Sequence, residues 1–174
     1  MKRTDPTETG KRGAQHRNTS LARSFACAVA GIQAGIRSER NMRLHVLAAT
    51  LVLVGELIVR PSLAQAALLL LCIFLVMAAE LLNTAVECVC DLVSGGRFHA
   101  LARMAKDCSA GAVLLLAAAA VGVAVCVGVS LYPWHWRLFS HHGWAAAVLN
   151  AGVLAALWTT AVVALAGRRS DDGG

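Results

Sequence analysis

Four long apolar segments most strongly constrain how this 174-residue chain can fold. They cover residues 44–59, 63–79, 109–131 and 144–166. A helix rises about 1.5 Å per residue and the hydrocarbon core of a membrane is about 30 Å thick, so each segment is near the length of one span. Strand-like alternation of polar and apolar residues is hard to find, and an open sheet edge would leave backbone groups without partners in lipid. We therefore expect an all-α integral membrane protein.

The composition agrees with this expectation, and the polar segments divide the chain. Hydrophobic residues make up 57% and charged residues 15%, whereas soluble domains are nearer a quarter charged. Residues 1–19 predict a disordered basic cytoplasmic tail, with no cleaved secretion signal. Residues 20–131 predict one membrane domain, and residues 132–143 an extracytoplasmic loop whose aromatic side chains suit the membrane interface. Residues 144–174 predict an extra transmembrane helix followed by a cytoplasmic tail.

An amphipathic helix is predicted ahead of the first span. Ser20 is a suitable N-cap, and Leu21, Phe25 and Val29 begin an apolar series at helical spacing. Such a helix lies in the membrane interface with its apolar face toward the lipid, although a soluble core helix is an alternative. The expected architecture is therefore a surface helix and three core transmembrane helices, with a fourth transmembrane helix at the C-terminal side.

The distribution of charge predicts the orientation in the membrane. Nine of the 16 Lys and Arg residues lie between Lys2 and Arg43, and a basic flank usually marks the cytoplasmic side. With four spans, the loop carrying Arg97, Arg103 and Lys106 also falls inside. This arrangement satisfies the positive-inside rule with the N-terminal tail on the cytoplasmic side. No nucleic-acid-binding module accompanies the basic residues, so we expect no nucleic-acid partner.

A few polar residues interrupt the apolar segments without forming a motif. Glu56 lies near the far end of the first span and is interpreted as a charge that snorkels to the interface. The six cysteines lie in apolar or helical segments without a CxxC pair and are interpreted as packing residues. His141 and His142 are adjacent, so they do not share a helix face and do not indicate a metal site.

A polar and acidic stripe at the end of the second span is the strongest functional signal. Glu80, Asn83, Glu87 and Asp91 are separated by 3, 4 and 4 residues, which places them within about 80° of the helix circumference. An ionised carboxylate near hydrocarbon costs several kcal/mol unless it is paired, protonated or metal-bound. A solvated helix extension is the alternative, but the opposite faces of this stretch are apolar. We therefore expect a functional site at the cytoplasmic end.

The residue types around this stripe favour phosphoryl transfer. Glu39, Arg43, Lys106 and Asp107 flank the first and third spans on the same predicted side. Carboxylates suit Mg²⁺, which takes one or two of them together with phosphate oxygens, and Lys and Arg suit phosphate. A remaining carboxylate can act as a general base on a hydroxyl. The phosphate loops of soluble nucleotide-binding proteins are missing from the chain.

Three motifs in this region resemble the prokaryotic diacylglycerol kinase family. They are AELLNTAVECVCDLV (79–93), LARMAKDCSAGAVLL (101–115) and the upstream SERNMRLH (38–45). The resemblance covers about residues 21–131 and makes residues 20–131 a membrane lipid kinase domain. It implies a small homotrimeric membrane kinase that transfers the γ-phosphoryl group of ATP to a lipid alcohol at the cytoplasmic face.

The resemblance also implies roles for the polar residues of the second span. Glu80 would be the general base on the lipid hydroxyl, and Asn83 would orient groups in the site. Glu39 and Glu87 would bind the Mg²⁺ that accompanies ATP, with Glu87 also close to the nucleotide. Asp91 would support the outer part of the site.

Four further residues are implied to contact the nucleotide or the lipid headgroup. Lys106 would contact phosphate and Asp107 the nucleotide, while Arg23 and Arg43 are weaker candidates. The family often has a basic residue before the glycine of the first helix. Here Ala30 precedes Gly31, which puts part of the nucleotide contact in doubt.

The lipid substrate is less closely specified than the reaction. Diacylglycerol, which would give phosphatidic acid, is the first choice, and undecaprenol is the alternative within the family because SERNMRLH with His45 is closer to those members. A small transporter that relays protons or cations is the alternative from another class, but it should carry mid-membrane charges and inverted repeats. A non-catalytic assembly protein would leave the acidic stripe unexplained.

Overall fold

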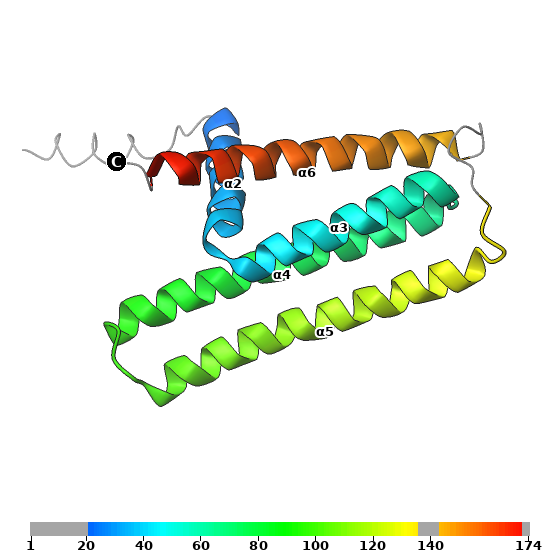
Figure 1. The fold of residues 1–174 in the computed structure, drawn as a ribbon. Helices are drawn as coiled ribbons and strands as arrows, with labels where there is room; N and C mark the ends of the chain where they lie inside the picture. The colour runs from blue at the N-terminus through cyan, green and yellow to red at the C-terminus, as the bar shows by residue number, and fades with distance from the viewer. Residues whose placement is uncertain (1–20, 136–142, 172–174) are drawn as a thin grey trace, which may run out of the picture. The chain divides into compact units, whose positions relative to one another are not determined.

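The computed structural model describes residues 21–135 and 143–171, and every regular element in these ranges is an α-helix (Figure 1). The helices are α2 (Leu21–Ser38), α3 (Arg40–Val59), α4 (Leu63–Ser94), α5 (Ala100–Ser130) and α6 (Trp144–Asp171). Four of them, α3 to α6, are long and apolar enough to cross a membrane. The predicted all-α class with four candidate spans is confirmed. The predicted tail over residues 1–19, the Ser20 cap and the adjacent histidines lie outside the described residues.

The connections are shorter than the sequence indicated. A single extended residue, Glu39, separates α2 from α3. Helix α5 already begins at Ala100, so Arg103 and Lys106, which we expected in a loop, lie on a helix. The chain reverses between α4 and α5 through Gly95 and Gly96, whose φ angles of 58° and 74° favour glycine. Polar residues in 40–43 and 100–106 therefore continue the helices, because the end of a spanning helix can extend into water.

Helices α4 and α5 are longer than a bilayer requires. With 32 and 31 residues they extend about 48 and 46 Å, against about 30 Å of hydrocarbon. The start of α4 is fixed by a capping box, in which the Ser62 hydroxyl accepts from the Gln65 backbone and the Gln65 side chain accepts from the Ser62 backbone. The excess length therefore falls at the other end, where the polar stripe lies.

Three polar contacts align α4 and α5 as an antiparallel pair. The Gln65 amide donates to the Ser130 hydroxyl at 3.0 Å near one end. The Ser109 hydroxyl donates to Asn83 Oδ1 at 2.6 Å near the other. Beyond it, Lys106 Nζ contacts Asp91 Oδ1 at 2.6 Å. Hydrogen bonds at these three levels fix the register of two helices whose other contacts are mostly between apolar groups.

Helices α3 and α6 complete the bundle: α3 packs against α4, and α6 packs against α3. Figure 1 shows α3 beside α4, α5 along α4, and α6 beside α3, and α6 also contacts α4. The Arg37 guanidinium Nε donates to the Ala164 carbonyl oxygen at 2.8 Å, so the end of α6 meets the end of α2. The N-terminal part of α4 and the N-terminal part of α6 consequently lie on one side of the bundle.

The chain divides into two compact units at Ile32, within α2. Leu21 and Phe25 in the first unit are strongly exposed, as an amphipathic surface helix requires, and its position on a membrane stays a prediction. The last turn of α2 belongs to the second unit. There Gly35 and Ile36 are buried, and a Cβ at Gly35 would lie 2.7 Å from Leu81 Cδ2.

Glu56 does not snorkel to the interface, and that prediction is wrong. Glu56 is only 5% exposed to solvent. Its Oε2 accepts a short hydrogen bond from Nδ2 of Asn150 in α6. Snorkelling was expected from the position of Glu56 near the end of a span. That α6 covers Glu56 could not be predicted, because no motif links Asn150 to Glu56.

Candidate active site

The polar stripe of α4 runs from the buried core to the exposed end of the helix. Glu80 and Asn83 are 1% and 6% exposed, Glu87 is half-buried, and Asp91 is exposed. Because α4 continues without a break through all four residues, their common face is confirmed. Their surroundings differ, so they can serve different purposes.

Asn83 joins α4 to α5 at the centre of the site. Its Nδ2 donates to Glu87 Oε1 at 2.8 Å, and its Oδ1 accepts from the Ser109 hydroxyl at 2.6 Å. The hydroxyl of Ser109 has one hydrogen and also lies 2.9 Å from the Lys106 carbonyl, so the shorter contact to Asn83 is favoured. The amide is thereby held in one orientation, with Glu87 fixed beside it.

Glu80 faces α3 and a polar cavity. The Asn41 side chain interacts with its carboxylate, and His45, Glu39 and Glu87 lie within electrostatic range. Its Oε1 is buried and has no hydrogen-bond partner among the described residues. A buried carboxylate oxygen normally has a partner, so this unpaired oxygen marks a position at which a ligand donor can bind.

The cavity beside Glu80 has a volume of about 210 Å³ and is formed by three helices. Its lining residues are Asn41, His45, Glu80, Asn83, Ala110, Val113, Leu114 and Ala117. The polar residues come from α3 and α4, whereas α5 contributes apolar side chains. A polar group that enters this space meets Glu80 and Asn83 against an otherwise apolar wall.

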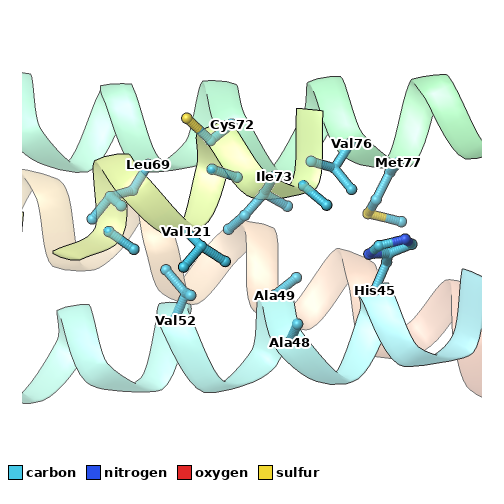
Figure 2. Close-up of a pocket in the computed structure, with 13 residues that line it drawn as sticks. His45, Ala48, Ala49, Val52, Leu69, Cys72, Ile73, Val76, Met77 and Val121 are labelled. Carbon is cyan, nitrogen blue, oxygen red and sulfur yellow. The ribbon is translucent and has the colours of Figure 1, made fainter. Parts of the chain in front are cut away.

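An apolar groove of about 150 Å³ adjoins this cavity (Figure 2). It runs between α3, α4 and α5 and is lined mainly by Ala, Val, Leu and Ile side chains. His45 and Ala117 line both spaces, so the two meet at these residues. Figure 2 shows the His45 ring facing Met77 across one end of the groove. The groove offers an apolar molecule a path that ends near Glu80.

The predicted phosphate-binding residues lie at the outer end of the site. Lys106 forms an ion pair with Asp91 at 2.6 Å and is one-third exposed. Asp107 is 73% exposed and lies 3.8 Å from Arg103 on the same helix. Neither residue lines the cavity at Glu80. A nucleotide at this end would therefore contact water-exposed, adjustable side chains.

Arg43, one of the two arginine candidates, does not line the cavity at Glu80. Arg43 Nη1 donates to the carbonyl oxygens of Ile36 and Arg37, at 3.3 and 3.0 Å, and so stabilises the end of α2. Arg23 belongs to the first compact unit, whose position relative to the site is not defined. The sequence could not distinguish an arginine that caps a helix from one that faces a ligand.

The carboxylates near Glu80 could bind one divalent cation if phosphate oxygens of a bound nucleotide supplied further ligands. Across residues 21–135 and 143–171 there is no cluster of three or more His, Cys, Asp or Glu side chains able to hold a metal alone. Mg²⁺ is usually held by one or two carboxylates together with substrate phosphates and water. Glu39 and Glu87, both within electrostatic range of Glu80, are candidates for these two carboxylates.

Three residues of the site were not assigned roles from the sequence. Asn41 and His45 lie four residues apart on α3 and face Glu80, and Ser109 holds Asn83 from α5. Asn41 and His45 occur in the SERNMRLH motif, and Ser109 follows the AKD segment. Their spacing indicated a shared face in the first case, but only the packing of three helices shows that they converge.

Comparisons with known proteins cover the part of the chain that forms this site. Residues 26–128 match the family model described as prokaryotic diacylglycerol kinase. The chain is 44% identical over 108 residues to diacylglycerol kinase from Synechocystis sp., covering 62% of each chain. It is 39% identical over 104 residues to undecaprenol kinase from Bacillus subtilis, covering 59% of this chain and 84% of that protein. No solved structure matches. Helix α6 follows the matched residues.

Proposed function

This chain belongs to the prokaryotic diacylglycerol kinase family, and we propose that it transfers the γ-phosphoryl group of ATP to the primary hydroxyl of a membrane lipid. The observation that carries this proposal is the position of Glu80. Its carboxylate is buried, has one unpaired oxygen, and faces a polar cavity that meets an apolar groove. A lipid alcohol presents the matching combination of an apolar chain and one hydroxyl.

The groove supports a lipid as the phosphoryl acceptor. Its lining is almost entirely apolar, and it adjoins the cavity at His45 and Ala117. Its apolar lining can accommodate the hydrocarbon chain of a lipid, while a polar headgroup would find few partners there. A lipid bound in this way places its hydroxyl toward Glu80 and its chain toward the membrane interior.

Glu80 then acts as the general base of the reaction. Its unpaired oxygen accepts the proton of the lipid hydroxyl as the hydroxyl oxygen attacks the γ-phosphorus. The bond between the γ-phosphorus and the β–γ bridging oxygen breaks, and ADP leaves with the electron pair. Asn83, fixed by Glu87 and Ser109, holds the neighbouring groups in position, so the site contributes by alignment as well as by proton transfer.

The carboxylates beside Glu80 would hold the metal that accompanies ATP. Glu39 and Glu87 would bind Mg²⁺, which would supply positive charge to offset that of the phosphates. Separating these roles explains why three carboxylates lie near one another. One takes a proton, and two bind a cation that offsets their mutual repulsion.

The outer residues complete the nucleotide site. Lys106 exchanges its contact with Asp91 for a phosphate oxygen when ATP binds, and Asp107 contacts the nucleotide. Asp91 holds Lys106 in place when no nucleotide is bound. Arg23 is a nucleotide candidate from the first unit, and Arg43 holds the end of α2 next to Glu39 and so supports the site indirectly.

Diacylglycerol is the proposed acceptor, with undecaprenol as the alternative. One relative is named diacylglycerol kinase and another undecaprenol kinase, and the chain spans 62% of the first and 84% of the second. Both lipids carry a primary hydroxyl on an apolar body. A transporter is not favoured, because the site carboxylates gather toward one end of α4 and the family is named for a kinase.

The proposed setting is the bacterial inner membrane, with the active site on the cytoplasmic side and a homotrimeric assembly. The basic residues near Glu39 and Lys106 support the orientation, because cytoplasmic loops are enriched in Lys and Arg. The trimer is implied by the family resemblance. Native mass spectrometry of the detergent-solubilised protein tests it directly.

A lipid phosphorylation assay tests the proposed function. The full-length protein is reconstituted in vesicles with Mg²⁺ and γ-labelled ATP, and diacylglycerol and undecaprenol are supplied separately. Label should enter the lipid fraction, with the faster reaction identifying the acceptor. Vesicles without added alcohol and samples with EDTA serve as controls. Absence of labelled lipid with both alcohols, in protein shown to be folded, would reject the kinase assignment.

A further inference from the structure

A second buried carboxylate lies away from the proposed active site, at the contact between α3 and α6. Glu56 of α3 is 5% exposed and Asn150 of α6 is fully buried. The Asn150 Nδ2 donates a short hydrogen bond to Glu56 Oε2. Asn150 lies beyond the residues that match the family model, so this contact joins the family domain to its additional helix.

Each side chain of the pair retains one buried oxygen without a partner. These atoms are Glu56 Oε1 and Asn150 Oδ1. Both are acceptors while the carboxylate is ionised, so neither can satisfy the other. The ion pairs of Asp107 with Arg103 and of Asp91 with Lys106 do not include Glu56. An ionised carboxylate buried in a spanning helix without a cation would be strongly disfavoured.

Protonation of Glu56 would remove both the buried negative charge and the mismatch of two unpaired acceptors. A hydrogen on Glu56 Oε1 neutralises the carboxylate and converts that oxygen into a donor. Asn150 Oδ1 is the acceptor available on the same partner side chain. A carboxylic acid and a primary amide each present one donor and one acceptor, so they can form two reciprocal hydrogen bonds.

We propose that Glu56 is protonated and forms a neutral carboxylic acid–amide pair with Asn150, and that this pair docks α6 onto the kinase domain within the membrane. Apolar contacts alone give little preference for one neighbour in lipid, since lipid chains are equally apolar. A buried polar pair specifies both the partner helix and its register. The contact from Arg37 of α2 to the Ala164 carbonyl holds the other end of α6.

A double-mutant cycle in the full-length protein tests the pair. Asn150→Leu leaves Glu56 buried without a partner and should lower the Tm in detergent by roughly 5 °C or more. Glu56→Leu should also lower it, because the Asn150 amide then lacks its acceptor. The double variant Glu56→Leu/Asn150→Leu removes both polar groups and should recover at least half of the larger loss. Losses that simply add in the double variant would overturn the docking role. If Asn150→Leu gives no folded protein, a folded double variant supports the pair and an unfolded one rejects it.

The Tm of the Glu56→Gln variant distinguishes a neutral Glu56–Asn150 pair from a charged one. Glutamine preserves the size of the side chain and its ability to form reciprocal hydrogen bonds with Asn150, so the Tm should stay within about 2 °C of the native protein. A loss as large as that of Asn150→Leu would contradict the neutral pair.

Infrared spectroscopy detects the proton without relying on stability. A carboxylic acid C=O band, distinct from carboxylate bands, should be present at neutral pH in the native protein. It should disappear in Glu56→Gln and persist in Glu80→Gln, the matched change at the other buried carboxylate. A band that is absent, or unaffected by Glu56→Gln, would overturn the assignment of the proton.

Discussion

Two buried glutamates on neighbouring helices have different surroundings, and we propose different roles for them. Glu80 faces a cavity from three helices, whereas Glu56 is covered by Asn150 of α6. The sequence indicated Glu80 because Asn83, Glu87 and Asp91 follow it at helical spacing. It could not indicate the partner of Glu56, since Asn150 lies 94 residues away and belongs to no motif. Local periodicity predicts a common face, but it carries no information about which distant helix covers that face.

Ser109 is expected to contribute through Asn83. Ser109→Ala removes the donor to Asn83 Oδ1 and leaves a buried acceptor unpaired, at a cost of about 1–2 kcal/mol. Because Asn83 would no longer be held in one orientation, kcat should fall about tenfold, equivalent to about 1.4 kcal/mol, with the KM for ATP unchanged. Ser130→Ala is the matched control, because its hydroxyl binds Gln65 at the other end of the same helix pair. Equal activity in both variants would remove Ser109 from the site.

Lys106 is expected to act on the nucleotide. Lys106→Gln should raise the KM for ATP about tenfold or more, because a charge-assisted phosphate contact is lost. The contact with Asp91 is exposed to solvent, so the free energy of unfolding should change little. Arg103→Gln removes a neighbouring positive charge on the same helix and should leave the KM near its native value. A similar rise in both variants would indicate a general charge effect instead of a phosphate contact.

At the scale of helices, apolar length predicted the four spans but underestimated how far they extend. The spans predicted at 44–59 and 109–131 correspond to helices over Arg40–Val59 and Ala100–Ser130. Hydropathy detects only the part of a helix in lipid, whereas backbone hydrogen bonding continues into water. The extensions are important because they place Asn41 and Lys106 on rigid helices. The site residues are thus held more firmly than linkers would hold them.

Gly35 allows the last turn of α2 to approach α4 closely. A larger side chain would meet Leu81 Cδ2, so Gly35→Val should lower the free energy of unfolding by about 1–3 kcal/mol through overpacking. Leu81→Ala creates space at the same position, and the double variant should recover part of the loss. Thermal unfolding in detergent measures both effects. A double variant less stable than the sum of its two single changes would contradict this contact.

At the scale of the molecule, the family domain and α6 make separate contributions. Residues 26–128 contain all the proposed catalytic and metal-binding residues, from Glu39 to Glu87, and α6 lies beyond them. The sequence motifs predicted the residues of the proposed site, and the apolar segments predicted the four candidate spans, which are confirmed. The orientation inferred from charge stays a prediction. The motifs could not predict that α6 would pack against α3 and the end of α2, because Asn150 and Ala164, which make these contacts, lie in a segment without a motif.

The antiparallel packing predicts the side on which the chain ends. Arg37 contacts Ala164, so the end of α6 lies with the end of α2 on the same side as the outer residues of the site. A green fluorescent protein fused after Gly174 should fluoresce in a bacterial host, and alkaline phosphatase fused there should be inactive. Active phosphatase at that position would contradict four spans with a cytoplasmic site.

The central claim is that Glu80 is the base in lipid phosphorylation, and a matched pair of substitutions tests it most directly. Glu80→Gln and Glu56→Gln each replace one buried glutamate by its amide, so both make the same chemical change. With Mg²⁺, ATP and the preferred lipid, Glu80→Gln should lower kcat at least about a hundredfold, while Glu56→Gln should stay within about twofold of the native rate. Native activity in the Glu80→Gln protein would contradict the account.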